Sequence, residues 1–119
     1  MNYTKDIGNF GEDIAKKYFL DAGYIYITRN VKSSHREIDL IFKIKNETIF
    51  VEVKTRIINH ESLKETPISR FQAKNLQHAI LDYSIKNKIN LDYARLDLIV
   101  ILIDKNKRCC SIRHYKNII

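Results

Sequence analysis

The sequence predicts one α/β domain with a central mixed sheet, in the element order α-β-β-β-α-β-β, and with helices packed on the sheet. Three observations lead to this fold class. Apolar residues recur at helical spacing over 6–22, strand-like runs fill 24–55, and residues 96–103 are apolar on both faces. A second helix, over about 69–87, separates the early strands from the late one, so the late strand is expected to run parallel to its neighbour. With 119 residues and 45% hydrophobic content, the whole of 1–119 fits one domain.

The first helix is expected over 6–22. Gly8 and Gly11 are unfavourable inside it, because each costs up to about 1 kcal/mol relative to Ala. Both lie toward the edge of the apolar stripe where Glu12 sits, and bare backbone there would allow a sheet or a ligand to approach closely. Gly23 follows in the position that a left-handed helix cap favours.

A strand over 24–31 and a polar loop over 32–35 are expected next, followed by a hairpin over 36–55. The turn of this hairpin is placed at Lys45-Asn46, since Asn tolerates the positive φ that tight turns need.

The predicted register of the hairpin brings two acids together. With Ile44 opposite Glu47, counting outward along both strands places Asp39 opposite Glu52. Their Cβ atoms would lie about 4.5–5.5 Å apart, where two carboxylates repel unless one is protonated or a cation lies between them. Lys54, on the same face as Glu52, supplies one positive charge, and a divalent metal would supply more. The alternative is an internal ion triad of Asp39, Glu52 and Lys54 without a metal.

The C-terminal half is expected to hold an exposed loop over 57–66, the second helix and two strands. The helix starts at Pro67 or Ser69 and ends near Asn87, and the last, weaker strand ends near Tyr115. The residues predicted on the buried side of this helix are Phe71, Leu76, Ala79, Ile80 and Tyr83.

Charge and cysteine usage narrow the function classes. A net charge of +7 and a pI near 9.4 favour an anionic partner, nucleic acid first. No apolar run reaches the roughly 18 residues of a membrane span, and no signal-peptide pattern is present, so a cytoplasmic protein without membrane contact is expected. Cys109 and Cys110 are adjacent, which fits neither a disulfide framework nor a zinc site, and we expect two reduced thiols near a strand end.

The blocks around the two acids resemble a known family. Asp39 followed by Glu52-x-Lys54 on the next strand looks like the core of the PD-(D/E)xK, or restriction-endonuclease-like, nuclease superfamily. More closely, nearly the whole chain resembles the YraN-like family of small, largely uncharacterised bacterial proteins. Two positions depart from that family: Arg36 stands where a Gly is usual, and the loop after Arg56 lacks a Phe-Gly pair. The residues that carry the resemblance are Gly8-x-x-Gly11-Glu12, Asn30, Glu37-Ile38-Asp39-Leu40-Ile41, Phe50-Val51-Glu52-Val53-Lys54-Thr55-Arg56, Lys74 and Arg95-x-Asp97.

The resemblance implies a metal site with Mg²⁺ or Mn²⁺ as the cofactor. Asp39, Glu52 and the backbone carbonyl of Val53 would hold the ion, and Glu12 would add a ligand or hold a metal-bound water. Lys54 would orient the attacking water or balance the charge that develops on the phosphorane. The resemblance gives a fold and a site more firmly than a reaction.

Other polar residues have weaker assignments. Glu37 lies on the strand face of Asp39 and is a candidate outer partner of the site, whereas His35 is expected to be a surface histidine. Arg95 and Asp97 most simply form an internal pair. The basic residues that could contact phosphates, each with a solvated surface charge as its alternative, are Arg56, Lys74, Arg36 and Arg70.

Three functions therefore compete at the level of the sequence. The leading hypothesis is a metal-dependent endonuclease that hydrolyses phosphodiester bonds in DNA, with branched or damaged DNA as the substrate to test first and DNA favoured over RNA. The second is a nucleic-acid-binding module that has the nuclease fold without cleavage. The third is a subunit whose fold serves protein interaction, and the resemblance also allows a homodimer.

Overall fold

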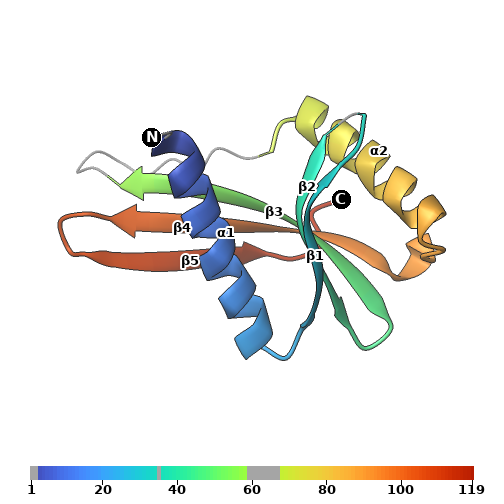
Figure 1. Ribbon diagram of the computed structural model, residues 1–119, viewed down its shortest axis with the longest axis horizontal. Coiled ribbons are helices and arrows are strands. Elements are labelled where there is room, and N and C mark those ends of the chain that lie inside the picture. Colours follow the sequence, from blue (N-terminus) through green and yellow to red (C-terminus); the bar gives the residue numbers. More distant parts are fainter. Residues whose placement is uncertain (1–2, 35, 59–67) are drawn as a thin grey trace.

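The computed structural model describes residues 3–34, 36–58 and 68–119, and it contains a five-stranded sheet and two long helices (Figure 1). The element order confirms the predicted α-β-β-β-α-β-β sequence, with one short 3-10 helix added before the late strands. The elements are α1 (Tyr3–Asp21), β1 (Ile25–Lys32), β2 (Glu37–Ile44), β3 (Glu47–Ile58), α2 (Arg70–Lys86), η1 (Leu91–Tyr93), β4 (Ala94–Asp104) and β5 (Cys109–Tyr115).

The strands lie in the order β1-β2-β3-β4-β5. Neighbouring strands are antiparallel except β3 and β4, which are parallel and are connected through α2. The expected mixed sheet with a parallel late strand is therefore confirmed. Within the described residues, no helix is long and apolar enough to cross a membrane.

The hairpin of β2 and β3 has the predicted register. Ile44 pairs with Glu47, and the ladder continues to Leu40 opposite Val51. The turn itself differs in one detail, because the positive φ of 52° belongs to Lys45 and not to Asn46. A positive φ at the first central position alone is the pattern of a type II′ hairpin turn, and Lys45 occupies that position.

Each face of the sheet carries one helix. Leu40 and Ile41 are adjacent on β2 and therefore point to opposite faces. Leu40 belongs to a core cluster with Ala15 and Phe19 of α1, whereas Ile41 belongs to one that α2 completes. The apolar residues that α2 contributes to that second core are Leu76, Ala79 and Ile80.

The close approach of α1 to the sheet depends on Gly11. A Cβ atom added at Gly11 would lie 1.8 Å from Oγ1 of Thr55 on β3, so a side chain at Gly11 would require Thr55, the helix or the strand to shift. A Cβ added at Gly8 would meet nothing within 4 Å. The expectation that bare backbone serves close packing is thus confirmed for Gly11 alone. Gly23 ends the helix region with a φ of 92°, as predicted.

Several predicted boundaries and one predicted core residue need correction. Phe71 is 74% exposed, because it lies about 140° around the helix from the buried Leu76. Ser69 caps α2 through a capping box with Gln72, which confirms the later of the two predicted starts; Pro67 lies outside the described residues. Residues 57 and 58 of the expected loop belong to β3, and 59–66 also lie outside the described part.

Candidate metal centre

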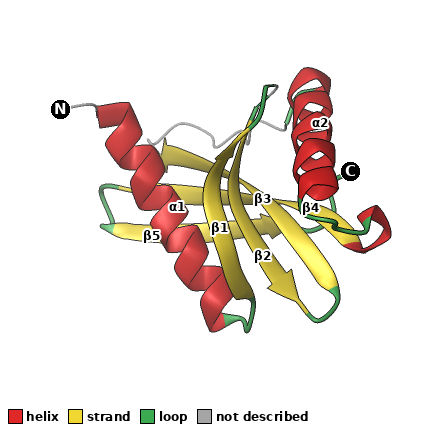
Figure 2. Ribbon diagram, turned by 45° about the vertical axis from the view of Figure 1, so that its right-hand side comes forward, coloured by secondary structure: helices red, strands yellow, loops and turns green. Residues whose placement is uncertain are grey.

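The functional side chains gather where β2 and β3 separate. The ladder between these strands ends at Leu40 and Val51. Beyond that pair β2 continues with β1 as its neighbour, and β3 continues to Ile58 with β4 as its neighbour. Figure 2 shows the β1–β2 pair turning away from the other three strands. Asp39 and Glu52 are the first residues past the last rung, and we call this place the fork.

Asp39 occupies the fork through a backbone contact. Its Oδ2 atom accepts the N–H of Val53 at 2.8 Å. In a strand the N–H and C=O groups of one residue point to the same side, so the carbonyl of Val53 also faces the fork. The sequence-based assignment of this carbonyl to the site therefore agrees with the orientation of the backbone.

The two predicted carboxylates meet at the fork. Burial raises the pKa of Asp39 from 3.8 to about 9, and a hydrogen bond and the negative charge of Glu52 add to the increase. In the absence of a cation, the pair of Asp39 and Glu52 therefore holds a proton more tightly than an isolated carboxyl group does. Glu52 itself is 3% exposed. The predicted closeness of these two acids is confirmed, but their predicted direct pairing is not, because the ladder between β2 and β3 ends at Leu40 and Val51.

Two further carboxylates approach from neighbouring elements. Three carboxylate oxygens, one each from Glu12, Glu37 and Asp39, lie within 4.8 Å of one another. Asn30 on β1 links the outer two, because its amide donates to Glu12 at 3.0 Å and to Glu37 at 2.9 Å. The backbone of Asn30 has a φ of 54°, a conformation that Asn tolerates better than most residues. The guanidinium of the neighbouring Arg29 also donates a hydrogen bond to Glu12, at 2.9 Å. Glu37 thus lies in the same acidic cluster as Asp39, and its role as an outer partner of the site stays a prediction.

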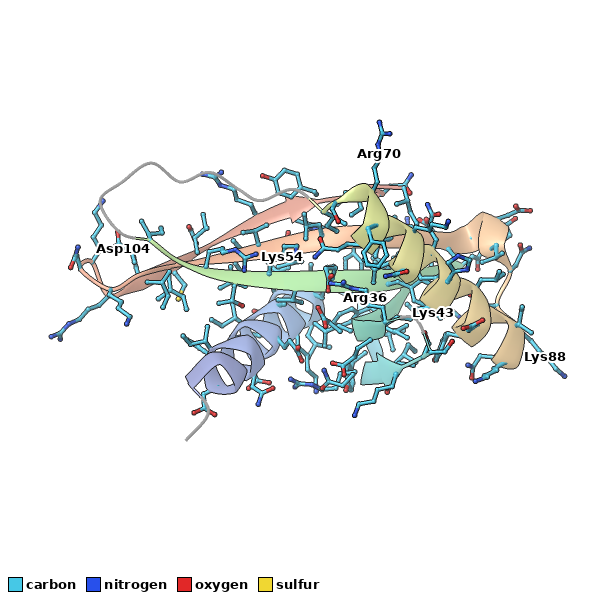
Figure 3. The ribbon with its side chains drawn as sticks, turned by 90° about the horizontal axis from the view of Figure 1, so that it is seen from above. Arg36, Lys43, Lys54, Arg70, Lys88 and Asp104 are labelled. Carbon is cyan, nitrogen blue, oxygen red and sulfur yellow. The ribbon has the colours of Figure 1, made fainter. Side chains whose placement is uncertain are left out.

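A pocket of about 550 Å³ opens over the fork. Figure 3 shows Lys54 and Arg36 beside the middle strands, whereas Arg70 extends away from them. Within the described part of the chain Lys54 has no ion pair, so its ammonium is available to a ligand. The predicted site residues that line this pocket are Glu12, Arg36, Asp39, Glu52, Val53, Lys54 and Arg56.

The predicted phosphate-binding residues divide into two groups. Arg56 and Arg36 line the pocket, but Arg36 donates a hydrogen bond to Oε2 of Glu52. Lys74 and Arg70 are exposed on α2 and do not line the pocket. His35 lies outside the described residues, and Cys109 and Cys110 are exposed free thiols at the start of β5.

Arg95 and Asp97 form the predicted internal pair on β4, where Asp97 is the strand partner of Val51. Nε and NH2 of Arg95 donate to the two oxygens of Asp97 at 2.8 and 3.0 Å. Asp97 also accepts from His114 and from the backbone N–H of Asn117. Burial opposes ionisation of Asp97, but these hydrogen bonds outweigh burial and lower the pKa of its carboxyl.

Sequence reasoning gave no role in the site to Arg29 and Asn30. Arg29 belongs to a run read only as a β-rich strand, and Asn30 was named only among the residues that carry the family resemblance. Both reach Glu12 across the space between β1 and α1. The available signal was an arginine and an asparagine together in an otherwise apolar strand, where polar residues need partners.

Comparisons with known proteins support one family. The model of the uncharacterised protein family UPF0102 matches residues 11–101. A UPF0102 protein of Clostridium botulinum (strain 657, type Ba4) is 42% identical over 120 residues, which cover 98% of this chain and 97% of the relative. A UPF0102 protein of Clostridium tetani (strain Massachusetts) is 38% identical over 117 residues, which cover 98% of this chain and 95% of the relative.

Proposed function

This chain belongs to the uncharacterised protein family UPF0102, the YraN-like family, and we propose that it is a metal-dependent endonuclease that hydrolyses phosphodiester bonds in DNA. The observation that carries the proposal is the pair Asp39 and Glu52 at the fork, with Lys54 in the same pocket. The element order and the mixed sheet are consistent with a restriction-endonuclease-like fold, which is part of the proposal.

The donor groups of the fork suit a hard divalent cation. Carboxylate and carbonyl oxygens are the ligands that Mg²⁺ and Mn²⁺ prefer. Asp39, Glu52 and the carbonyl of Val53 would hold the ion, and Glu12 or Glu37 would complete its shell directly or through water. Burial and the neighbouring Glu52 raise the pKa of Asp39, and a cation bound beside this acid would favour its charged form. When bound, the cation would polarise the phosphate and lower the pKa of a bound water.

The residues of the chain have separate tasks in this proposal. Asp39 gives up its proton as the cation binds. Lys54 orients the attacking water and stabilises the charge that develops on the phosphorane in the transition state. Arg56, exposed at the rim of the same pocket, contacts a phosphate of the DNA backbone.

The experiment that tests this function is cleavage of linear, single-stranded, flapped and four-way DNA with Mn²⁺ or Mg²⁺. The proposal requires cleavage of at least one substrate by the wild type and none by Glu52→Ala. A reaction that persists in Glu52→Ala would indicate a contaminating nuclease.

One contact favours the second candidate, a nucleic-acid-binding module without cleavage. The guanidinium of Arg36 already pairs with Glu52, so this acid has a partner without any metal. A module of this kind binds DNA and cuts none of the four substrates with either cation. If the protein neither binds nor cuts DNA, an interaction subunit is left.

A further inference from the structure

The guanidinium of Arg36 contacts one of the two acids of the fork. Its NH2 group contacts Oε2 of Glu52, whose side chain is 4% exposed, and both residues line the pocket. Glu52 is thus neutralised by a guanidinium, whereas Asp39 beside it shares the site without a cation of its own. A carboxylate oxygen held by a guanidinium has less electron density to offer a metal.

The pair of Arg36 and Glu52 is incomplete as a structural ion pair. Nε of Arg36 is buried and has no hydrogen-bond partner in the described part of the chain. A buried N–H without a partner is unfavourable, so the guanidinium is held with a penalty. The side chain of Arg36 is 27% exposed, which leaves a path out of the fork.

The backbone of Arg36 is anchored while its side chain can turn. The carbonyl of Arg36 accepts the N–H of Ser33 at 3.1 Å, and the hydroxyl of Ser33 accepts the N–H of Arg36 at 3.4 Å. Arg36 directly precedes β2, so these two bonds hold its backbone at the start of the strand.

From these contacts we propose that Arg36 is a built-in competitor of the divalent cation: it holds Glu52 in the metal-free protein and must leave Glu52 when the metal binds. This inference rests on the proposed metal centre. It assigns to Arg36 the setting of metal affinity, a role distinct from the phosphate contact that the sequence predicted. Arg36 stabilises the buried Glu52 without metal and weakens the affinity of the site for metal.

The test is a calorimetric titration of Mn²⁺ into the metal-free protein at pH 8. Arg36→Gln removes the competing charge and should lower the Mn²⁺ dissociation constant about tenfold or more. Arg36→Lys keeps the charge but loses the fork-shaped donor, so its affinity should lie between the wild type and Arg36→Gln. Arg56→Gln is the matched control, because Arg56 lines the same pocket without contacting a carboxylate of the site, and its affinity should stay within about threefold of the wild type.

Thermal unfolding gives an independent readout. In EDTA, Arg36→Gln should unfold at a lower temperature than the wild type, because Glu52 is left buried without a partner. Excess Mn²⁺ should restore the lost stability, and Arg56→Gln should show neither change.

The outcomes separate the inference from the proposed function. If the wild type binds Mn²⁺ and Arg36→Gln binds it equally or more weakly, the competition is wrong and the metal centre stands. If none of the proteins binds Mn²⁺, both are wrong. If Arg36→Gln does not fold in EDTA, the titration of Arg36→Lys decides: affinity above that of the wild type supports the competition, and equal or lower affinity contradicts it.

Discussion

The carboxylate of Asp39 accepts the backbone N–H of Val53 at 2.8 Å, so this side chain replaces the strand partner that β3 loses at the fork. The bond fixes the orientation of Asp39 and of the Val53 carbonyl together. It also places the half-buried Asp39 beside Glu52, and partial burial together with Glu52 raises the pKa of Asp39. This hydrogen bond therefore sets the backbone geometry of the fork, and it also places Asp39 beside Glu52, which raises the pKa of Asp39.

The pH dependence of stability should report the proton that the pair of Asp39 and Glu52 holds. The pKa of Asp39 is raised to about 9 from an ordinary 3.8, so the folded protein binds the proton more tightly than the unfolded chain. The contribution is fully present below about pH 4 and is lost as the pH rises toward about 9. Asp39→Asn should flatten this decline and raise the unfolding temperature of the metal-free protein at pH 8, measured by calorimetry in EDTA. An unchanged decline in Asp39→Asn would assign the proton to another group.

Catalysis and binding should separate between Lys54 and Arg56. Lys54→Ala should leave DNA affinity nearly intact and depress cleavage strongly, because its charge acts in the transition state. Arg56→Ala should weaken DNA binding and reduce the slope of log K against log salt by about one unit, as for one lost phosphate contact. Cleavage rates measure the catalytic effect, and DNA-binding isotherms at several salt concentrations measure the change in affinity for each variant. Equal losses of affinity in the two variants would remove the distinction.

The docking of α1 on β3 should depend on Gly11 but not on Gly8. Gly11→Ala places a Cβ atom against Thr55 and should cost about 1–3 kcal/mol in the free energy of unfolding. Gly8→Ala meets open space and should be neutral or stabilise by up to about 1 kcal/mol through helix propensity. Urea denaturation of the two single variants is the measurement. Similar effects of the two substitutions would show that helix propensity alone determines the change in the free energy of unfolding.

The Arg95–Asp97 pair should be a determinant of acid stability. The pKa of Asp97 is lowered, so its contribution is present above the ordinary carboxyl pKa and is lost as the pH falls below it. Asp97→Asn leaves the guanidinium of Arg95 with only its longer ion pair to Glu47, at 3.6 Å, and should cost about 3–5 kcal/mol at pH 7. Asp92→Asn, at an exposed acid, is the control and should change little. A small effect of Asp97→Asn would show that His114 and Arg95 find other partners.

The sequence predicts those parts of the site that depend on backbone spacing. The turn at Lys45-Asn46 fixes the register, and the register brings Asp39 beside Glu52. The contact of Arg36 with Glu52 was not foreseen, because it depends on the direction of one long side chain before β2. The reach of Asn30 from β1 to Glu12 depends likewise on how two elements pack.

The prediction of which helix residues are buried has the same limit. Phe71 was predicted as buried because it is apolar and near the start of α2, yet the helix turns it to solvent. Ser84 takes a buried place on the sheet side. Periodicity identifies the stripe that contains Leu76, Ala79 and Ile80, but it does not settle which apolar residues at its ends remain covered.

The central claim is that the fork binds a divalent cation, and anomalous scattering from a crystal grown with Mn²⁺ tests it most directly. The account predicts an anomalous peak about 2 Å from the carboxylate of Asp39 and from the carbonyl of Val53, with the guanidinium of Arg36 moved away from Glu52. The peak should be absent from crystals of Asp39→Asn grown under the same conditions. A well-ordered fork without a peak at saturating Mn²⁺, or a peak confined to other residues, would contradict the account.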